Sequence, residues 1–165
     1  VLEHPETLEE LLQFCFHEDT KLATKATWVL EFVCRKNIQL IFPSLDFIFE
    51  KLPAAKSDGQ VRSFGLICEL ITIGYYQKKQ KEYREALTQK HKEVMTECCF
   101  DWMITNQKVA CQARAMTALY FLGTEAAWIH PELASIIQQN LSEGSAGYVN
   151  RGQKTLDLIS ACSKG

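Results

Sequence analysis

Apolar residues recur at intervals of three and four along the whole chain, and no alternating apolar–polar pattern lasts for six residues. Intervals of three and four place side chains on one face of an α-helix, whereas strand residues alternate every second position. Breaker residues fall between the periodic segments more often than inside them. The pattern therefore predicts an all-α chain with eight helices. They span about residues 6–17, 20–36, 38–52, 60–77, 81–104, 108–122, 131–141 and 148–162.

Two of these segments carry further information about their surroundings. Pro43 falls inside the third segment, and because proline lacks the N–H that a helix interior needs, it should kink that helix or mark its true start. The second segment is apolar around much of its circumference, which predicts burial on several sides. Its apolar residues are Trp28, Val29, Leu30, Phe32, Val33 and Cys34.

The helices pair into four hairpins within a single domain, at about residues 5–36, 38–77, 81–123 and 128–162. One hairpin cannot bury both of its apolar faces alone, so neighbouring hairpins should stack. A small residue occupies the same place in the second helix of each pair, where it lets two helices approach closely. These residues are Ala26, Gly65, Ala115 and Gly152.

The second helices carry a recognisable motif. Residues 58–65 read Asp-Gly-Gln-Val-Arg-x-x-Gly, and residues 112–119 read Gln-x-x-Ala-x-x-Ala-Leu. They resemble the second helix of HEAT repeats, in which Asp precedes Val-Arg-x-x-Ala-x-x-Ala-Leu. The resemblance covers essentially the whole chain and implies a right-handed α-α superhelix. Two positions depart from the pattern, because Glu69 stands where leucine is usual and Ala23 stands in the arginine place.

Composition and charge narrow the class of protein. The chain has 165 residues, of which 47% are hydrophobic and 23% charged, as expected for a folded domain. Charged residues interrupt every apolar stretch well before the roughly 20 residues that a bilayer requires, so no membrane association is expected. The net charge of −2 argues against a dedicated nucleic-acid binder. Residues 1–20 carry six acidic residues and no Lys or Arg.

The seven cysteines lie mostly among apolar residues at helical spacing, and they form no C-x-x-C motif. This pattern predicts reduced, buried thiols in a cytoplasmic protein. Cys98 and Cys99 with His91 make the best metal candidate, but adjacent helical residues point about 100° apart. We therefore expect neither a metal nor another cofactor.

Catalytic motifs are missing from the sequence, which contains no H-E-x-x-H, Walker loop, G-x-S-x-G or G-x-G-x-x-G. The expected activity is therefore non-enzymatic: a scaffold or adaptor that binds a protein or peptide on the concave face formed by the second helices. Core packing is the favoured role for each tryptophan over an interface role, and Trp102 is predicted to be a core residue. The residues predicted to contact the partner are Lys25, Trp28, Arg62, Arg114, Arg151 and Lys154.

A basic run forms the other candidate surface. With Tyr83 inside it and Tyr75 and Tyr76 just before it, the run suits an acidic peptide or single-stranded nucleic acid. The alternative is a solvated helix start in which Glu82 and Glu85 pair locally. Its residues are Lys78, Lys79, Lys81, Arg84, Lys90 and Lys92.

Two other functions remain open. The first is nucleic-acid binding, because the chain is similar in architecture to HEAT-like DNA glycosylases of the alkylation-repair type. Such enzymes need a basic groove, aromatic residues and a carboxylate, and Asp101 beside Trp102 is the one adjacent pair that the sequence offers. This chain is shorter than those enzymes and acidic. The second is a regulatory subunit or a self-assembling array.

Overall fold

The computed structural model describes residues 1–165 and contains helices and loops but no strand, so the all-α prediction is confirmed. Four of the long helices, α2, α4, α6 and α9, begin at a residue whose side chain caps the helix. Asp19, for example, accepts hydrogen bonds from the backbone N–H groups of Lys21 and Leu22 at the start of α2. The α-helices are α1 (Leu8–Cys15), α2 (Thr20–Asn37), α3 (Leu45–Lys51), α4 (Asp58–Thr72), α5 (Lys81–Ala86), α6 (Gln89–Ile104), α7 (Val109–Gly123), α8 (Ile129–Asn140) and α9 (Ala146–Ser163).

Short helical segments extend several of these elements. The 3₁₀ helices lie at Pro5–Thr7, Ile38–Ser44 and Leu52–Ala54, and a π-helical turn at Ile73–Gln77 continues α4. Pro43 lies in the second of the 3₁₀ segments, so the α-helix proper starts after it at Leu45. Of the two outcomes expected for this proline, the later start is the one observed.

The predicted long helix at 81–104 is wrong, because the chain breaks there into α5 and α6. Leu87 has an extended backbone, and Thr88 caps α6 by accepting a hydrogen bond from the N–H of His91. The His91 ring in turn accepts from the N–H of Thr88 at 3.1 Å. This reciprocal capping box starts a new helix without any Gly or Pro.

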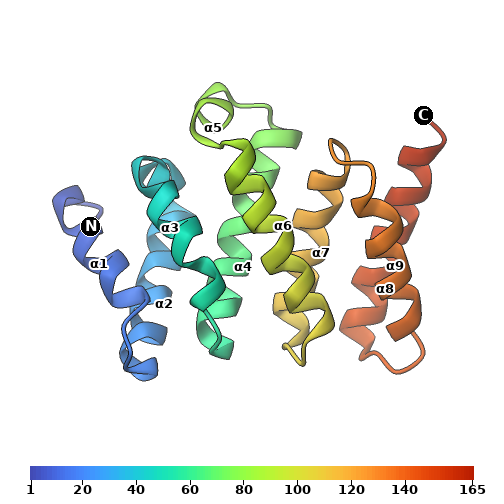
Figure 1. The fold of residues 1–165 in the computed structure, drawn as a ribbon, viewed down its shortest axis with the longest axis horizontal. Coiled ribbons are helices and arrows are strands. Elements are labelled where there is room, and N and C mark those ends of the chain that lie inside the picture. The colour runs from blue at the N-terminus through green and yellow to red at the C-terminus, as the bar shows by residue number, and fades with distance from the viewer.

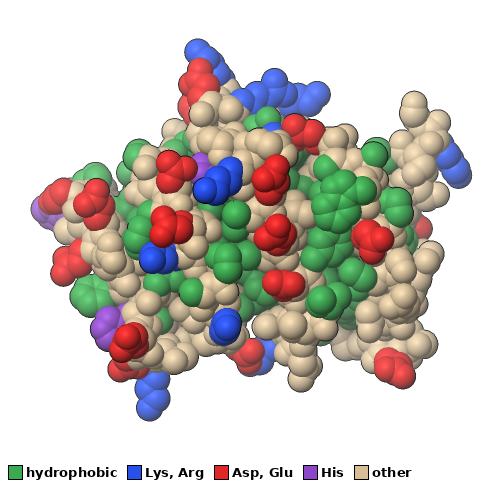
Figure 2. Space-filling view, in the orientation of Figure 1, with side chains coloured by type: hydrophobic (Ala, Val, Ile, Leu, Met, Phe, Trp, Pro, Cys, Tyr) green, Lys and Arg blue, Asp and Glu red, His purple; other side chains and the backbone are tan.

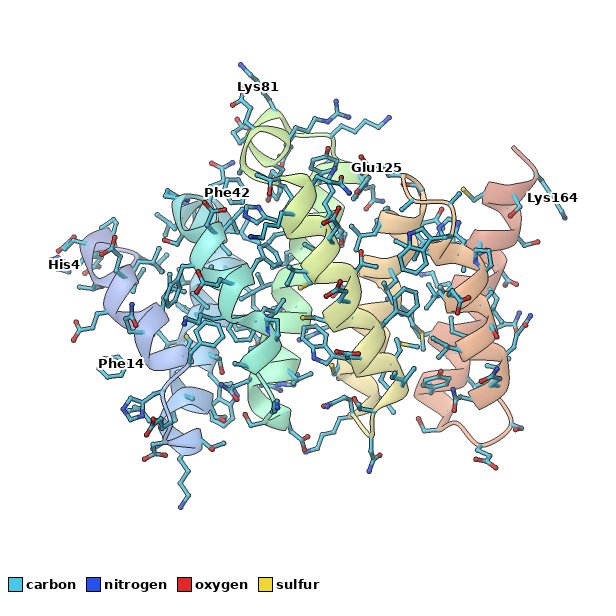
Figure 3. The ribbon with its side chains drawn as sticks, in the orientation of Figure 1. His4, Phe14, Phe42, Lys81, Glu125 and Lys164 are labelled. Carbon is cyan, nitrogen blue, oxygen red and sulfur yellow. The ribbon has the colours of Figure 1, made fainter.

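Four helix pairs stack side by side from one end of the molecule to the other (Figure 1). The pairs are α1–α2, α3–α4, α6–α7 and α8–α9. In Figure 1 the first helices of these pairs lie in front of the second helices, and α5 projects from the top. His4 and Lys164 mark the two opposite ends of the stack (Figure 3).

One continuous apolar core runs through all four pairs, from Leu8 in α1 to Ile159 in α9. Trp102 belongs to it with 4% of its surface exposed, as predicted. All four small residues of the second helices are buried. A Cβ added to Gly152 would lie 2.9 Å from Ile137 Cγ2 of α8, so the close approach between α8 and α9 depends on glycine there.

The prediction that α2 is buried on several sides is wrong for one flank. Trp28, Val29 and Phe32 each expose half or more of their surface, while Leu30, Val33 and Cys34 are buried. The structure contains no helix that is both long and apolar enough to cross a membrane.

Candidate binding surface on the second helices

The two faces of the stack carry opposite charge. We call the outward residues of α2, α4, α7 and α9 the second-helix face, and those of α1, α3, α6 and α8 the first-helix face. The second helices contain eight Lys or Arg and four Asp or Glu, whereas the first helices contain three and eight. Figure 2 shows the first-helix face, on which acidic side chains outnumber basic ones over the central helices. The net charge of −2 therefore conceals a basic side and an acidic side.

An aromatic stripe follows the exposed side of α2. Lys25, Trp28 and Phe32 are spaced by three and four residues and so share one side of the helix. Trp28 is 51% exposed and Phe32 is 55% exposed. Lys36 extends the stripe by one turn, with Nζ 5.8 Å from the centre of the Phe32 ring. The stripe is thus an apolar surface bordered by cations.

A chain of polar contacts begins beside this stripe at Glu31. Its Oε1 accepts from Arg35 Nη2 at 2.9 Å, and its Oε2 accepts from the Ser63 hydroxyl of α4 at 2.8 Å. Burial acts to raise the pKa of Glu31, but the hydrogen bonds from Ser63 and Arg35 and the charge of Arg114 lower it overall. The carboxylate therefore links α2 to α4 in its charged form.

The polar contacts continue to the C-terminal end of the stack through two arginines. Arg114 of α7 donates to the carbonyl of Arg62 at 2.9 Å, and its Nε lies 4.0 Å from Glu69 Oε2. Arg151 of α9 donates to Thr117 Oγ1 at 2.6 Å, and its Nη1 lies 3.8 Å from Glu69 Oε1. Glu69 thus stands between two arginines from two other helices.

The chain as a whole matches a known family. The family model for the HEAT repeat domain matches residues 1–155. The chain belongs to the HEAT repeat family. No curated protein and no solved structure matches the chain. HEAT repeat domains commonly act as scaffolds for protein interactions and are typically not catalytic.

In this HEAT domain the six residues predicted to contact a partner fall into two groups. Four of them are exposed, and their side chains form no hydrogen bond within the chain: Lys25, Trp28, Arg62 and Lys154. Arg114 and Arg151 are partly buried and engaged by Glu69 and Thr117, so their first role is to join neighbouring repeats. Whether these residues bind a partner stays a prediction.

Two contributors to the surface were not predicted. Phe32 was expected to be buried, yet it is as exposed as Trp28. The spacing of four residues from Trp28 was a signal that both share one side of α2. Glu69 was predicted only to depart from the HEAT pattern. An acidic residue at a position where leucine is usual was the signal for a polar contact there.

The residues of the basic run also fall into an exposed group and one buried, paired residue. Lys78, Lys79, Lys81, Arg84 and Lys90 are exposed, and Lys81 stands at the outer end of α5 (Figure 3). The local pairing considered above occurs between Lys81 and Glu85, with Nζ 3.4 Å from Oε1. Lys92, however, is only 7% exposed and does not belong to this surface.

Lys92 instead joins three segments through side-chain hydrogen bonds: the π-helical turn, α6 and the loop after α7. Its Nζ donates to the Tyr75 hydroxyl at 2.9 Å and to Glu125 Oε2 at 2.9 Å. Tyr76 also donates to Glu125, at 2.5 Å, and these bonds lower the pKa of Glu125. Burial opposes the charge on Lys92, but the bonds to Tyr75 and Glu125 raise its pKa overall. Tyr75 and Tyr76, which were expected to serve a ligand, are therefore turned inward, and Tyr83 of the same expected surface is buried.

The structure places most of the cysteines in the core and His91 in contact with another residue. Six thiols are buried and Cys162 is exposed. Burial raises the pKa of Cys15 to about 12, which makes this thiol unreactive at neutral pH. His91 is bound away from the cysteine pair, since its Nε2 lies 2.6 Å from Asp46 Oδ1. No three His, Cys, Asp or Glu side chains are grouped to hold a metal.

The pair considered for glycosylase chemistry does not lie on the second-helix face. Asp101 and Trp102 are on α6, a first helix, where Asp101 is exposed and Trp102 is buried in the core. A buried indole cannot stack on an extruded base. The basic residues of the second helices lie on the other side of the stack from this carboxylate.

Proposed function

We propose that this HEAT domain is a non-enzymatic scaffold that holds a protein partner on its second-helix face, and that the docked segment is acidic and carries a large apolar side chain. The observation that supports this most directly is the stripe on α2. Trp28 and Phe32 are more than half exposed there, and Lys25 and Lys36 border them. No stability requirement accounts for two exposed aromatic rings on a helix whose opposite side already packs against its neighbours.

The chemistry of the stripe defines what fits it. Tryptophan anchors are enriched among the residues that dominate binding energy, because the ring buries a large area with little loss of conformational freedom. Lys25 and Lys36 on the stripe, together with the exposed Arg62 on the adjacent α4, attract an acidic segment and raise its association rate at low salt. The fixed pairs at Glu31 and Glu69 hold the neighbouring helices in register, so the surface is formed before the partner arrives.

A peptide-display library selected on the purified chain tests this function. We expect the enriched sequences to combine Asp or Glu with Trp, Phe or Leu. Trp28→Ala should weaken a selected peptide roughly tenfold or more, as for an interface anchor. Trp128→Ala is the matched control, because Trp128 is equally exposed but lies on the other side of the stack, and binding should not change.

Two outcomes would overturn this assignment. If selection yields no acidic sequence, or if Trp28→Ala and Phe32→Ala leave binding unchanged, the stripe is not the docking surface. A gel shift with single-stranded DNA or RNA at low salt that disappears in Arg62→Glu would favour the nucleic-acid alternative. The variant Arg84→Glu separates the exposed basic run from the second-helix face in both assays.

A further inference from the structure

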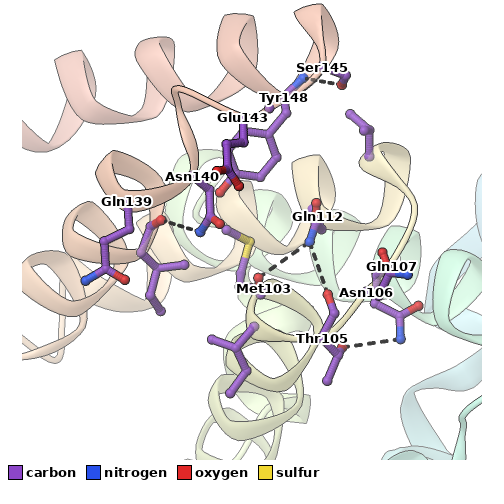
Figure 4. Close-up of a pocket in the computed structure, with 14 residues that line it drawn as sticks. Met103, Thr105, Asn106, Gln107, Gln112, Gln139, Asn140, Glu143, Ser145 and Tyr148 are labelled. Atoms are coloured by element: carbon purple, nitrogen blue, oxygen red, sulfur yellow. Dashed lines mark hydrogen bonds between the residues drawn. The ribbon is translucent and has the colours of Figure 1, made fainter.

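Two cavities between α6 and α8 form a groove on the first-helix face. Its middle, at Phe100 and Trp128, has an apolar floor, whereas its lower end is lined mainly by polar side chains. A cavity of about 260 Å³ lies at its upper end, lined by Glu93, Glu97, Trp128 and the Lys92–Glu125 ion pair. A second cavity of about 600 Å³ lies at its lower end, lined by residues that include Ile104, Ile136 and Gln139 (Figure 4).

Phe100 joins the two ends of this groove. It lies about one helical turn from both Glu97 and Ile104 on α6. Its ring stacks on the Trp128 indole, with the ring centres 5.7 Å apart. Trp128 is 58% exposed and Ile104 is 67% exposed, whereas Trp102 on the buried side of the same α6 is only 4% exposed. Large apolar side chains left open in one strip mark a surface for another molecule.

The rim of the groove that α6 forms is acidic. Glu93, Glu97 and Asp101 follow α6 at intervals of four residues, so their carboxylates form a row with about 6 Å between neighbours. None of the three forms an ion pair. Figure 2 shows acidic side chains along one side of an apolar patch over α6 and α8. Like charges four residues apart destabilise a helix, so folding alone does not explain the row.

No Lys or Arg forms an ion pair with the acidic row, although Lys56 lines a cavity with Asp101 on the side of α6 that faces Leu52–Ala54. α8 contains Glu132 and no Lys or Arg, and residues 93–107 contain no Lys or Arg either. Lys92, the cation nearest in sequence to the row, is held by Glu125 and Tyr75 and is almost fully buried. The uncompensated charge and the exposed floor therefore occur together at one place.

We propose that the groove between α6 and α8 binds a basic amphipathic helix of a partner protein. The apolar side of that helix would cover Trp128, Phe100 and Ile104. Its Lys or Arg residues, spaced by four, would face the row Glu93, Glu97 and Asp101, because both helices repeat at the same rise per turn. An acidic segment, a nucleic acid and an anionic membrane are all repelled by the same row.

This site is separate from the second-helix face, which is proposed to bind a segment of the opposite charge on the opposite side of the stack. Failure of one proposal therefore leaves the other intact. Together they describe a connector that holds an acidic segment on one face and a basic helix on the other.

A synthetic basic amphipathic peptide, with leucines on one side and lysines every fourth residue on the other, is the direct probe. Its counterpart with glutamate at every lysine position is the control. We expect fluorescence anisotropy to show binding of the basic peptide, weakened by added salt, and no binding of the acidic one. In NMR spectra of the isotope-labelled chain, the indole N–H signal of Trp128 should move on titration while that of Trp28 stays in place.

Charge reversal locates the site. Glu97→Lys at the centre of the row and Trp128→Ala should each weaken the basic peptide roughly tenfold or more. Both side chains are exposed, so neither variant should affect folding, which circular dichroism checks. Glu85→Lys on α5 and Trp28→Ala are the matched controls and should bind as the unmodified chain does.

Three results would overturn the proposal. One is the absence of binding to the basic peptide at low salt. Another is binding that Glu97→Lys and Trp128→Ala do not weaken. The third is concentration-dependent dimerisation in sedimentation velocity that Glu97→Lys abolishes, because the groove would then be filled by the exposed basic run of a second copy instead of a partner protein.

Discussion

Glu69 occupies a position of α4 where the HEAT pattern usually has leucine, and its carboxylate lies within 4.0 Å of arginines from α7 and α9. A leucine there would contact neighbouring side chains only through packing. The acid instead places one negative charge between Arg114 and Arg151, which would otherwise repel each other across the surface. One departure from the repeat pattern thereby fixes the spacing of two repeats.

Replacing Glu69 with glutamine tests this role at the scale of one residue. Glu69→Gln keeps the size of the side chain but removes its charge, so we expect the free energy of unfolding to fall by about 1 kcal/mol. Glu85→Gln removes the exposed partner of Lys81 and should cost less than about 0.5 kcal/mol. Urea unfolding followed by circular dichroism measures both. Equal effects of the two variants would mean that Glu69 contributes no more than a surface pair.

At the scale of an element, two glycines of one continuous helical segment should respond in opposite ways to alanine. A Cβ at Gly65 would have Arg114 Cβ as its nearest neighbour at 3.7 Å, an ordinary contact. Gly65→Ala should therefore stabilise the fold by up to about 1 kcal/mol through helix propensity. A Cβ at Gly74 in the π-helical turn would overlap the Tyr83 ring of α5.

Gly74→Ala should accordingly destabilise the chain by about 1–3 kcal/mol, because Tyr83 must leave its place. The same unfolding measurement compares the two variants, and a loss of stability in Gly65→Ala would show that the helix contact at this position is tighter than the structure indicates. Increased proteolysis near α5 in Gly74→Ala would identify Tyr83 as the displaced group.

The helices that the sequence predicted well are those whose ends carry local signals. Asp19 at the start of α2 and Gly123 at the end of α7 are examples, and both lie within two residues of the predicted ends. The break between α5 and α6 was missed because no Gly or Pro marks it. Thr88 caps α6 with His91 in place of the usual Glu or Gln, so the pattern of a capping box was not visible in the sequence.

The candidate surface was predictable only in part for a related reason. Helical spacing was enough to place Trp28 on one side of α2, but it could not decide whether that side was covered. Tyr75 and Tyr76 precede a basic run in sequence, yet the π-helical turn directs them onto Lys92 and Glu125. Such contacts join segments 17 to 49 residues apart, which a local pattern does not record.

At the scale of the whole molecule, the stack separates charge between its two faces. Each helix pair places its first helix on one side and its second on the other, so a modest bias in each helix adds up over four pairs. The row on α6 and the cations of α2 are the extremes of this bias. A net charge close to zero thus coexists with two surfaces that select segments of opposite charge.

The same architecture determines how the molecule unfolds locally, because each helix pair contacts only the neighbouring pairs. Ten of the fifteen residues of α4 are buried, against four of the eighteen residues of α9. We therefore expect hydrogen exchange, followed by mass spectrometry, to be slowest in α4 and α7 and faster in α1 and α9. Gly152→Ala, which forces Ile137 aside, should speed exchange in α8 and α9 while α2 and α4 keep their protection. If exchange accelerated equally in all helices, the four pairs would unfold as one cooperative unit, and the stability of the second-helix face would depend on both ends of the chain.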